Sequence, residues 1–404
     1  MKFALVTVGT RGDVQPYLAV ALALVARGHE AWIATHQEHE PLVRAYGLEH
    51  RPIAGGMRQL VGSELGRAWL SSASSPRQYA KYAREIFGPL QRAWLEDADA
   101  AVEGADAVLY YAMAVHAVHA AERRGLPAVA LAPWPLVPTR EYASVLAPWL
   151  DVLPGFALLR ANDLVMRLAM GGFNDEHLAH RARVGLARYR EPDPMHFALA
   201  RGVPTVHLFS EAVLPRPRDW GAQHDVAGFA FAPRADYAPP GELRRFLDSG
   251  PPPIYLGFGS MTGQTPEELT TLACHAARLA GVRAIVGGGW TGAASSTSSE
   301  VYVVDEIPHD WLFSRVSAVV HHGGIGTFAE GLRAGKPTVI AAFFADQPFW
   351  GRRNEVLGTG PPTLLRTGVT PEKLAAAIRG ALTDARYRVP VSYTHLRAHE
   401  TVLD

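Results

Sequence analysis

Short apolar segments alternate with helix-like segments along the first 130 residues. Apolar runs that predict strands lie at 2–8, 31–35, 107–111 and 128–132. Patterns that predict helices separate them at 16–28, 41–47, 76–103 and 114–124. A strand that is apolar at nearly every position has both faces buried, which is typical of a parallel sheet covered by helices. The first part of the chain therefore predicts a doubly wound α/β unit.

The same alternation begins again in the second half. Apolar segments at 254–260, 283–289, 301–307, 318–324 and 338–343 predict strands, and 266–280 predicts the first helix between them. This pattern predicts a second doubly wound unit. Ligands of such sheets bind outside the carboxyl ends of the strands. Two units joined by a linker are therefore expected to form a cleft between those ends.

Three stretches interrupt the alternation. The Gly/Ser-rich stretch 54–75 predicts a mobile loop. Residues 133–175 are rich in Trp, Met, Phe and Pro, and helices at 157–171 and 174–187 are expected to follow. A Pro-rich segment at 233–253 separates the halves. We predict domains at 1–235 and 253–388 with a linker at 236–252, and we expect 389–404 to be a non-native tail.

Charge and composition then narrow the class of protein. Lys and Arg number 39 and so do Asp and Glu, which gives a net charge of zero. That balance argues against bulk nucleic acid or an anionic membrane as the main partner. The single cysteine excludes a disulfide framework and an all-cysteine metal site, and it fits a cytoplasmic location. No apolar run approaches the length of a transmembrane segment, and the chain opens as a strand rather than a signal peptide.

The strongest chemical signal is HHGGIGTFAEG at 321–331. A predicted strand enters this segment, Gly323 and Gly324 make the turn, and a helix follows. Backbone N–H groups at a helix start bind anions, and glycine lets phosphate approach the backbone closely. His322 and Thr327 can add side-chain donors. The alternative interpretation is a tight turn without a ligand.

Two further polar groups follow predicted strands. Asp346 and Gln347 come after the strand at 338–343, where a carboxylate and an amide can bind neighbouring sugar hydroxyls; the alternative is a helix cap. Arg11, Gly12 and Asp13 are expected on the loop before the first helix, again facing the cleft. Asp13 can accept a proton from a hydroxyl, although it can also simply cap that helix.

Together these motifs resemble one family. The opening GTRGDVQP, AVLPRPRDW (212–220), GFGSM (257–261), IPHDWLF (307–313), the glycine-rich turn and ADQPFWG are similar to the GT-B glycosyltransferases of family 1, closest to the sterol, macrolide and glycopeptide group. The resemblance spans residues 1 to about 388. It implies two Rossmann-like domains facing a central cleft. It also implies an inverting transferase that needs no metal or other cofactor and uses a UDP- or TDP-sugar, UDP-glucose first among them.

The resemblance also implies roles for individual residues. Asp13 would be the general base. The residues expected to hold the donor are Arg11, Gly12, Ser260, His309, Trp311, His322, Gly323, Gly324, Thr327, Glu330, Asp346 and Gln347. Glu330 would bind the ribose, a mild departure from the alanine that the nearest group often has there. The chain is expected to act as a monomer or weak dimer.

The acceptor is expected to be a hydrophobic small molecule such as a sterol, polyketide, flavonoid or lipid. His116, Trp134 and Met170 are candidates to line its pocket, and core packing is the alternative. Three other classes of protein remain open. The opening motif and ADQPFWG argue against a nucleotide-sugar epimerase. The absence of an acidic ribose partner argues against an NAD-dependent oxidoreductase. The intact donor motifs argue against a non-catalytic auxiliary protein.

Overall fold

The computed structural model describes residues 1–71, 76–232, 237–259, 265–287, 298–304 and 307–387. The described chain forms two compact units. The first contains the residues up to 232 except 212–214, and the second contains 212–214 and the residues from 237 onward. The segment 212–214 is held within the second unit by the Arg353 guanidinium, whose Nη2 donates to the Val213 carbonyl at 2.6 Å. The expected non-native tail, 389–404, lies outside the described residues.

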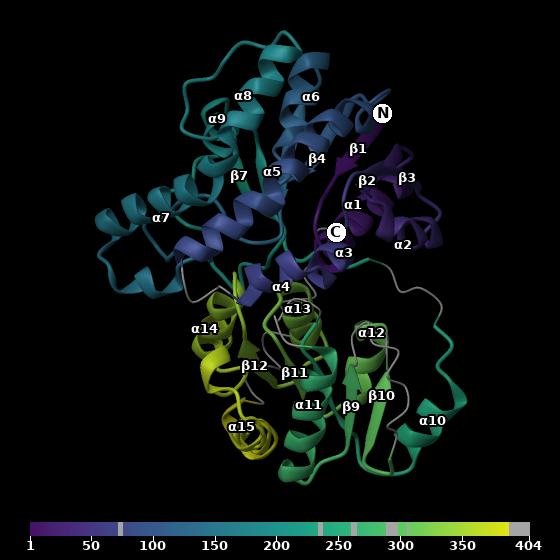
Figure 1. Ribbon diagram of the computed structural model, residues 1–404. Helices are drawn as coiled ribbons and strands as arrows, with labels where there is room; N and C mark the ends of the chain where they lie inside the picture. Colours follow the sequence, from purple (N-terminus) through teal and green to yellow (C-terminus); the bar gives the residue numbers. More distant parts are fainter. Residues whose placement is uncertain (72–75, 233–236, 260–264, 288–297, 305–306, 388–404) are drawn as a thin grey trace. The chain divides into compact units, whose positions relative to one another are not determined.

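The first unit is built on a seven-stranded sheet in the order β3-β2-β1-β4-β5-β6-β7 (Figure 1). Every strand pair is parallel. The strands are β1 (Lys2–Val6), β2 (Glu30–His36), β3 (Glu49–Ile53), β4 (Ala107–Tyr111), β5 (Ala128–Ala132), β6 (Thr205–His207) and β7 (His224–Val226). β4, in the middle, is buried at every position, as its continuous apolar run predicts.

Helices connect these strands and cover the sheet. They are α1 (Arg11–Ala26), α2 (Glu40–Ala45), α3 (Met57–Gly62), α4 (Glu64–Ser71), α5 (Pro76–Ala101), α6 (His116–Arg124), α7 (Gly155–Met170), α8 (Asn174–Arg183) and α9 (Pro194–Ala200). α1 packs on β1 and β2, whereas α5 contacts β3 and packs along α4, α6 and α8 (Figure 1). The described residues contain no helix with the length and apolar character needed to cross a membrane.

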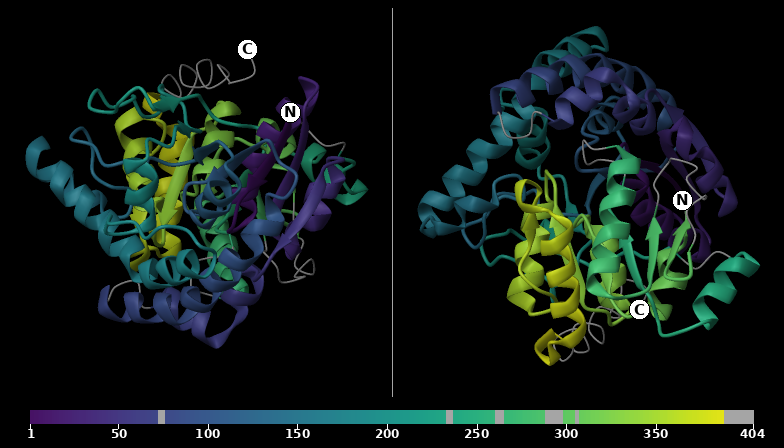
Figure 2. Two further views of the ribbon diagram at one scale, coloured as in Figure 1. Left: turned by 90° about the horizontal axis from the view of Figure 1, so that it is seen from above. Right: turned by 60° about the horizontal axis from the view of Figure 1, so that its bottom comes forward.

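The second unit repeats this architecture with a six-stranded sheet in the order β10-β9-β8-β11-β12-β13, again parallel throughout. Its strands are β8 (Ile254–Gly257), β9 (Ala284–Gly287), β10 (Val301–Val304), β11 (Val319–His321), β12 (Thr338–Ala342) and β13 (Leu364–Leu365). Its helices are α10 (Gly241–Asp248), α11 (Pro266–Ala280), α12 (His309–Leu312), α13 (Ile325–Arg333), α14 (Gln347–Leu357) and α15 (Pro371–Thr383). α11 and α15 lie side by side (Figures 1 and 2).

The start of the first helix departs from the prediction. The sequence predicts a helix from 16, with residues 11–13 on the preceding loop. In the structure α1 begins at Arg11, and Pro16 lies inside it. Asp13 is therefore on the first turn, where its carboxylate accepts from the amide of the N-cap residue Thr10. Pro16 only removes the N–H that would bond the exposed Gly12 carbonyl.

The Gly/Ser-rich stretch 54–75 is not the predicted loop over its described part, because it contains α3 and α4. Ser63 accepts the amide of Gly66 through its hydroxyl at 3.0 Å and so caps α4. A Cβ on Gly66 would lie 1.9 Å from the Leu60 carbonyl oxygen. Ser63 and Gly66 therefore allow α3 and α4 to meet closely. A stretch rich in serine and glycine is equally typical of a loop, so the composition does not predict these helices.

Part of the predicted linker is also structured. Residues 236–252 contain α10, and its Leu243 and Phe246 are buried in a core cluster of the second unit. β3 and α9 were not predicted. β3 reads EHRPI, and its charges and proline fit an edge strand rather than a buried one. α9 does carry a start signal, since the Asp193 side chain accepts from the amides of Met195 and His196.

The first unit buries a directed chain of polar side chains from α5, α6 and α8. Arg181 donates to Nδ1 of His119 at 3.0 Å, His119 bonds Nδ1 of His177 through Nε2 at 2.9 Å, and His177 bonds the Gln91 oxygen through Nε2 at 3.2 Å. A guanidinium only donates, so both imidazoles must carry their single proton on Nε2. The same Nη1 of Arg181 also donates to the Glu122 carboxylate at 2.6 Å. Burial, with further lowering by neighbouring His and Arg, lowers the pKa of His177 to about 3.

His116 is buried beside this chain without joining it. Its ring lies 5.7 Å from that of Trp94, and neither ring nitrogen has a hydrogen-bond partner among the described residues. Burial lowers the pKa of His116 to about 3. An unfolded histidine titrates near pH 6.5, so the unfolded state binds more protons as the pH falls toward 3. The His116 titration therefore leaves the free energy of unfolding unchanged above about pH 6.5 and lowers it progressively as the pH falls from there toward 3.

We predict that His116→Leu raises the free energy of unfolding, and by more at pH 5 than at pH 8. At pH 8 the gain comes from removing an unpaired buried polar group, a penalty of about 1–3 kcal/mol. At pH 5 the variant gains more, because its unfolded state is no longer stabilised by protonation of His116. Urea titrations at both pH values measure the difference. The matched control is His275→Leu on α11, where the histidine is exposed. An equal gain at both pH values contradicts the prediction.

Candidate active site

Each sheet has one point where the order of its strands reverses. In the first unit the chain runs outward from β1 to β2 and β3 on one side, and from β4 to β5 on the other. In the second unit β8 and β11 have the same relation. The carboxyl ends of such central strand pairs are where open α/β sheets bind ligands. These two positions define the candidate sites, one in each unit.

Asp13 lies at the position of strand reversal in the first unit, just after β1. Its Oδ2 accepts from the Thr10 amide at 2.7 Å and from the Thr10 hydroxyl at 3.0 Å. Gly9 makes this possible: its φ is +128°, and an added Cβ would lie 2.4 Å from the same Oδ2. The carboxylate is thus fixed against the backbone of the loop that leaves β1.

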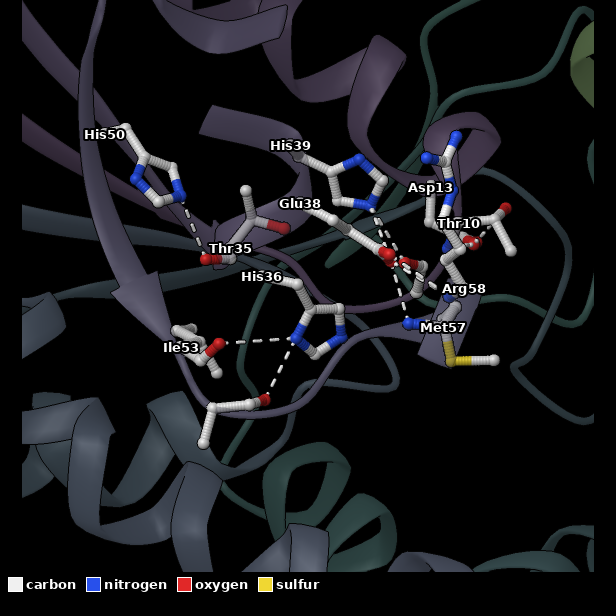
Figure 3. Close-up of polar contacts among 12 residues, drawn as sticks. Thr10, Asp13, Thr35, His36, Glu38, His39, His50, Ile53, Met57 and Arg58 are labelled. Atoms are coloured by element: carbon white, nitrogen blue, oxygen red, sulfur yellow. Dashed lines mark hydrogen bonds and ion pairs between the residues drawn. The ribbon is translucent and has the colours of Figure 1, made fainter. Parts of the chain in front are cut away.

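Residues at the end of β2 surround the same loop (Figure 3). His39 bonds the Gly9 carbonyl through Nε2 at 3.1 Å, and its Nε2 lies 3.7 Å from the Glu38 carboxylate. Glu38 accepts the amide of Met57 at 2.7 Å and so caps α3. His36 shares its Nδ1 between two backbone carbonyls, 3.0 Å from that of Ala54. These polar side chains connect the Asp13 loop to β2 and α3.

The environment of the Asp13 carboxyl group acts in two directions. Burial raises its pKa above the usual value. Hydrogen bonds from Thr10 and from the Tyr111 hydroxyl, together with the nearby His39, act to lower it. A carboxylate that is partly desolvated yet hydrogen-bonded is, in its charged form, a stronger proton acceptor than an exposed one. The surroundings of Asp13 agree with the general-base role that the resemblance implies, which stays a prediction.

Tyr111 is the last residue of β4, the strand next to β1 in the sheet. Its hydroxyl accepts the indole N–H of Trp134 at 2.8 Å. Trp134 follows β5, the next strand along. The side chains of Asp13, Tyr111 and Trp134 thus come from the carboxyl ends of three neighbouring strands and form one hydrogen-bonded series.

In the second unit the glycine-rich turn follows β11 and leads into α13. Gly323 has a φ of +97°, and an added Cβ would lie 3.0 Å from Ile340 Cγ2 and 3.1 Å from the Gln347 carbonyl oxygen. Gly324 is the N-cap of α13 and provides no side-chain cap. The N–H groups and dipole of the first turn are therefore available for an anion. Thr327 lies on this turn.

His322 sits at this helix start, across the position of strand reversal from β8. It hydrogen-bonds the backbone of Gly257, the last residue of β8, and packs against Gly259 and Gly324. Its Nδ1 is buried without a hydrogen-bond partner among the described residues. Burial lowers the pKa of His322 to about 4, so the ring is neutral at pH 7. The hydrogen bond to Gly257 uses the single N–H of the neutral ring, so donation to a bound anion as well requires the protonated ring, which a nearby anion favours.

The loop that follows β12 lies against the glycine turn. Asp346 is the N-cap of α14, and its Oδ2 accepts the indole N–H of Trp350 at 2.8 Å. Gln347 is buried, and its Oε1 accepts the amides of Phe343 and Phe344 at 2.8 and 3.2 Å. Ala345 between these contacts has a φ of +54°, which is strained for a residue with a side chain. With both oxygen lone pairs engaged, Gln347 can offer a ligand only N–H groups.

Glu330 and His309 lie farther from the turn. Burial, with a contribution from Asp310, raises the pKa of Glu330 to about 7, although Arg333 at 3.7 Å acts against this. Its carboxyl group is therefore protonated more readily near neutral pH than that of an exposed glutamate. His309 stacks on Phe313 with ring centroids 4.6 Å apart, and its Nε2 is 3.3 Å from the Tyr255 hydroxyl.

The structure separates the predicted site residues into groups. Asp13 in the first unit, and His322, Gly323, Gly324, Thr327, Asp346 and Gln347 in the second, lie at or next to the positions of strand reversal. Arg11 and Gly12 are exposed on the first turn of α1. Ser260 lies outside the described residues.

Three other predicted residues are buried in the cores of their units. His116 and Met170 are buried in the first unit, and Met170 packs in its main hydrophobic cluster. Trp311 is buried in a cluster of the second unit, with the Arg315 guanidinium 4.3 Å from its ring centroid. Their side chains are enclosed by neighbours of their own unit, which agrees with core packing, the alternative left open for His116 and Met170. The ligand contacts expected of all three residues stay predictions.

Sequence reasoning missed Gly9, Thr10, His39 and Tyr111. A signal for Tyr111 was available, since a hydroxyl at the last position of the predicted strand 107–111 must reach the carboxyl edge of the sheet. Thr10 followed by Asp13 also has the spacing of a capping pair. His39 carries no signal of this kind, because its contact with Gly9 depends on the pairing of β2 with β1.

Comparison with known proteins gives one family. Residues 3–142 match the glycosyltransferase family 28 N-terminal domain, and residues 289–399 match the erythromycin biosynthesis protein CIII-like C-terminal domain. A sterol 3-beta-glucosyltransferase of Arabidopsis thaliana is 35% identical over 393 residues, 95% of this chain and 61% of the relative. O-mycaminosyltylonolide 6-deoxyallosyltransferase of Streptomyces fradiae is 33% identical over 95% of this chain and 90% of its own length.

Solved structures show the same fold. The glycosyltransferase of kitacinnamycin has a TM-score of 0.68 at 22% identity and covers 100% of this chain and 96% of its own. The glycosyltransferase VinC in complex with dTDP has a TM-score of 0.67 at 18% identity and covers 99% and 95%. The chain spans less than two thirds of the length of the Arabidopsis relative but most of the Streptomyces one.

The glycine turn after β11 yields a prediction about stability. Gly323→Ala forces a side chain into the left-handed region and against the Gln347 backbone, so we expect a loss of about 1–2 kcal/mol or more in the free energy of unfolding. Gly326→Ala is the matched control: this glycine is helical and has no neighbour within 4 Å of an added Cβ. It should gain up to about 1 kcal/mol. Urea titration compares them, and equal effects would refute the account of this turn.

Proposed function

The chain belongs to the GT-B glycosyltransferases, in the group that includes sterol and macrolide enzymes, and we propose that it transfers a sugar from a nucleoside diphosphate to a hydrophobic alcohol. The observation that carries this proposal is the start of α13. There an uncapped helix N-terminus lies beside His322, whose buried Nδ1 has no partner among the described residues. The uncapped N–H groups suit a diphosphate, which is the leaving group of such a reaction, and the anion would favour the protonated form of His322, in which both ring nitrogens donate.

In the proposed reaction, Asp13 accepts the proton of the acceptor hydroxyl as the oxygen attacks the anomeric carbon. The new C–O bond forms while the bond between that carbon and the diphosphate oxygen breaks. The electron pair leaves with the diphosphate, and attack from the opposite face inverts the anomeric configuration. Donors at the α13 N-terminus and His322 stabilise the departing charge, a role for which the proposal needs no metal. Among the described residues, no group of three His, Cys, Asp or Glu is arranged to hold one.

The remaining residues of the second unit are proposed to orient the donor. Asp346 and the N–H groups of Gln347 would bind sugar hydroxyls, and Glu330 the ribose. Glu330, with its raised pKa, could serve there both as a hydrogen-bond donor and as an acceptor. A UDP- or TDP-sugar is proposed, with UDP-glucose first, because the sterol relatives are named as glucosyltransferases and two solved neighbours hold thymidine diphosphate.

The acceptor is proposed to be a sterol or a macrolactone, the compounds named for the relatives. Incubation with UDP-glucose or TDP-glucose and a panel of sterols and macrolactones, followed by mass spectrometry, tests this. The expected result is an acceptor heavier by one hexose together with one equivalent of nucleoside diphosphate. Nucleotide release that is independent of acceptor, or a change in the sugar without transfer, contradicts the proposal and favours hydrolysis or epimerisation.

Two variants should separate chemistry from donor binding. Asp13→Asn keeps an oxygen that can accept from Thr10, so we expect a folded protein that binds UDP normally but transfers about 100-fold more slowly or worse. His322→Ala should weaken UDP binding in calorimetry. Near-normal turnover of folded Asp13→Asn rules out the base role. Unchanged UDP affinity in His322→Ala rules out the diphosphate role.

A further inference from the structure

The hydrogen-bonded series behind Asp13 has a fixed direction. The indole of Trp134 can only donate, so the Tyr111 oxygen accepts in their 2.8 Å contact. The single proton of Tyr111 is then available to Asp13, to which this hydroxyl is hydrogen-bonded. Each link is a donor to the next, and the series ends on the carboxylate.

Burial makes this series stiff. Tyr111 is 5% exposed, and its ring packs edge-on against Tyr17 with centroids 6.2 Å apart. Tyr111 is the last residue of β4, whereas Asp13 lies on the first turn of α1 and Trp134 lies two residues after β5. Because β1, β4 and β5 are hydrogen-bonded neighbours in the sheet, the segments that follow them start side by side at the same edge.

We propose that Tyr111, oriented by the indole N–H of Trp134, is a positioning residue that holds the Asp13 carboxylate as a fixed, charged proton acceptor. This rests on the proposed function of Asp13 and adds two residues to it. It also gives the indole of Trp134 a role different from the acceptor contact expected from the sequence. Tyr111 acts through Asp13 and need not touch either substrate.

The test is the pH dependence of kcat/KM in Tyr111→Phe. Losing a donor to the carboxylate while burial remains favours the protonated acid. The acidic limb should move to higher pH by about one unit, so the loss of kcat/KM reaches about tenfold at pH values below the limb and becomes much smaller above it. Trp134→Phe should shift the limb in the same direction by less, lowering kcat while leaving the acceptor KM nearly unchanged.

Other titratable groups near Asp13 must be accounted for. In the described residues these are His39 from the turn after β2 and Tyr17 on its own helix. His39→Gln, alone and with Tyr111→Phe, removes the histidine titration from the comparison. Tyr17→Phe is the matched control, because this buried hydroxyl donates to the Leu131 carbonyl at 2.8 Å instead of to the carboxylate. It should leave the acidic limb in place.

The outcomes separate the two proposals. If Asp13→Asn abolishes transfer but Tyr111→Phe keeps the wild-type pH profile, the positioning role is wrong and the base role stands. If Asp13→Asn transfers normally, the base role fails first. A Trp134→Phe enzyme with a raised acceptor KM and an unshifted profile assigns the indole to acceptor binding and overturns its part here. Circular dichroism and UDP affinity establish that each variant is folded.

Discussion

Both units depend on the same constraint, the reversal of strand order at the centre of an all-parallel sheet. Because parallel strands all end at one edge, residues that follow two central strands are brought to the same place although they lie far apart in sequence. In the first unit this brings Tyr111 to Asp13. In the second it brings His322 to the end of β8. The binding properties of each edge then depend on the polar groups gathered there: the carboxylate of Asp13 in the first unit, and the uncapped N–H groups of α13 in the second.

Glycine is what allows those groups to come so close. Gly9 lets the carboxylate of Asp13 lie on the backbone, and Gly323 lets the turn after β11 pack on Gln347. At each position a Cβ would overlap the neighbouring group, so the absence of a side chain lets the backbone approach that group directly. The candidate sites are therefore as rigid as the ends of the strands themselves.

The sequence predicted most of the strands and several of the helices, because runs such as AVLYY and TVIAA are apolar throughout and have few alternatives to a central parallel strand. It failed where a local signal had two meanings. Pro16 is typical of a helix start, yet α1 begins five residues earlier. Ser63 and Gly66 are typical of a loop, yet they allow α3 and α4 to pack closely. β3 was not predicted because it is an edge strand, which can contain charged residues and proline and so lacks a continuous apolar run. For the sites, motifs located Asp13 and His322, but the contact of His39 with Gly9 arises only from strand pairing and could not be deduced locally.

The loop at Ala345 has a thermodynamic consequence. A left-handed alanine is uphill by about 1–3 kcal/mol, and it persists because Gln347 binds two amides of the same loop and Asp346 holds Trp350. These contacts are internal to the protein, so the loop is ordered before any ligand arrives. Binding of the proposed donor at this loop would lose little conformational entropy, which would leave more of the interaction free energy for affinity and for discrimination between similar ligands.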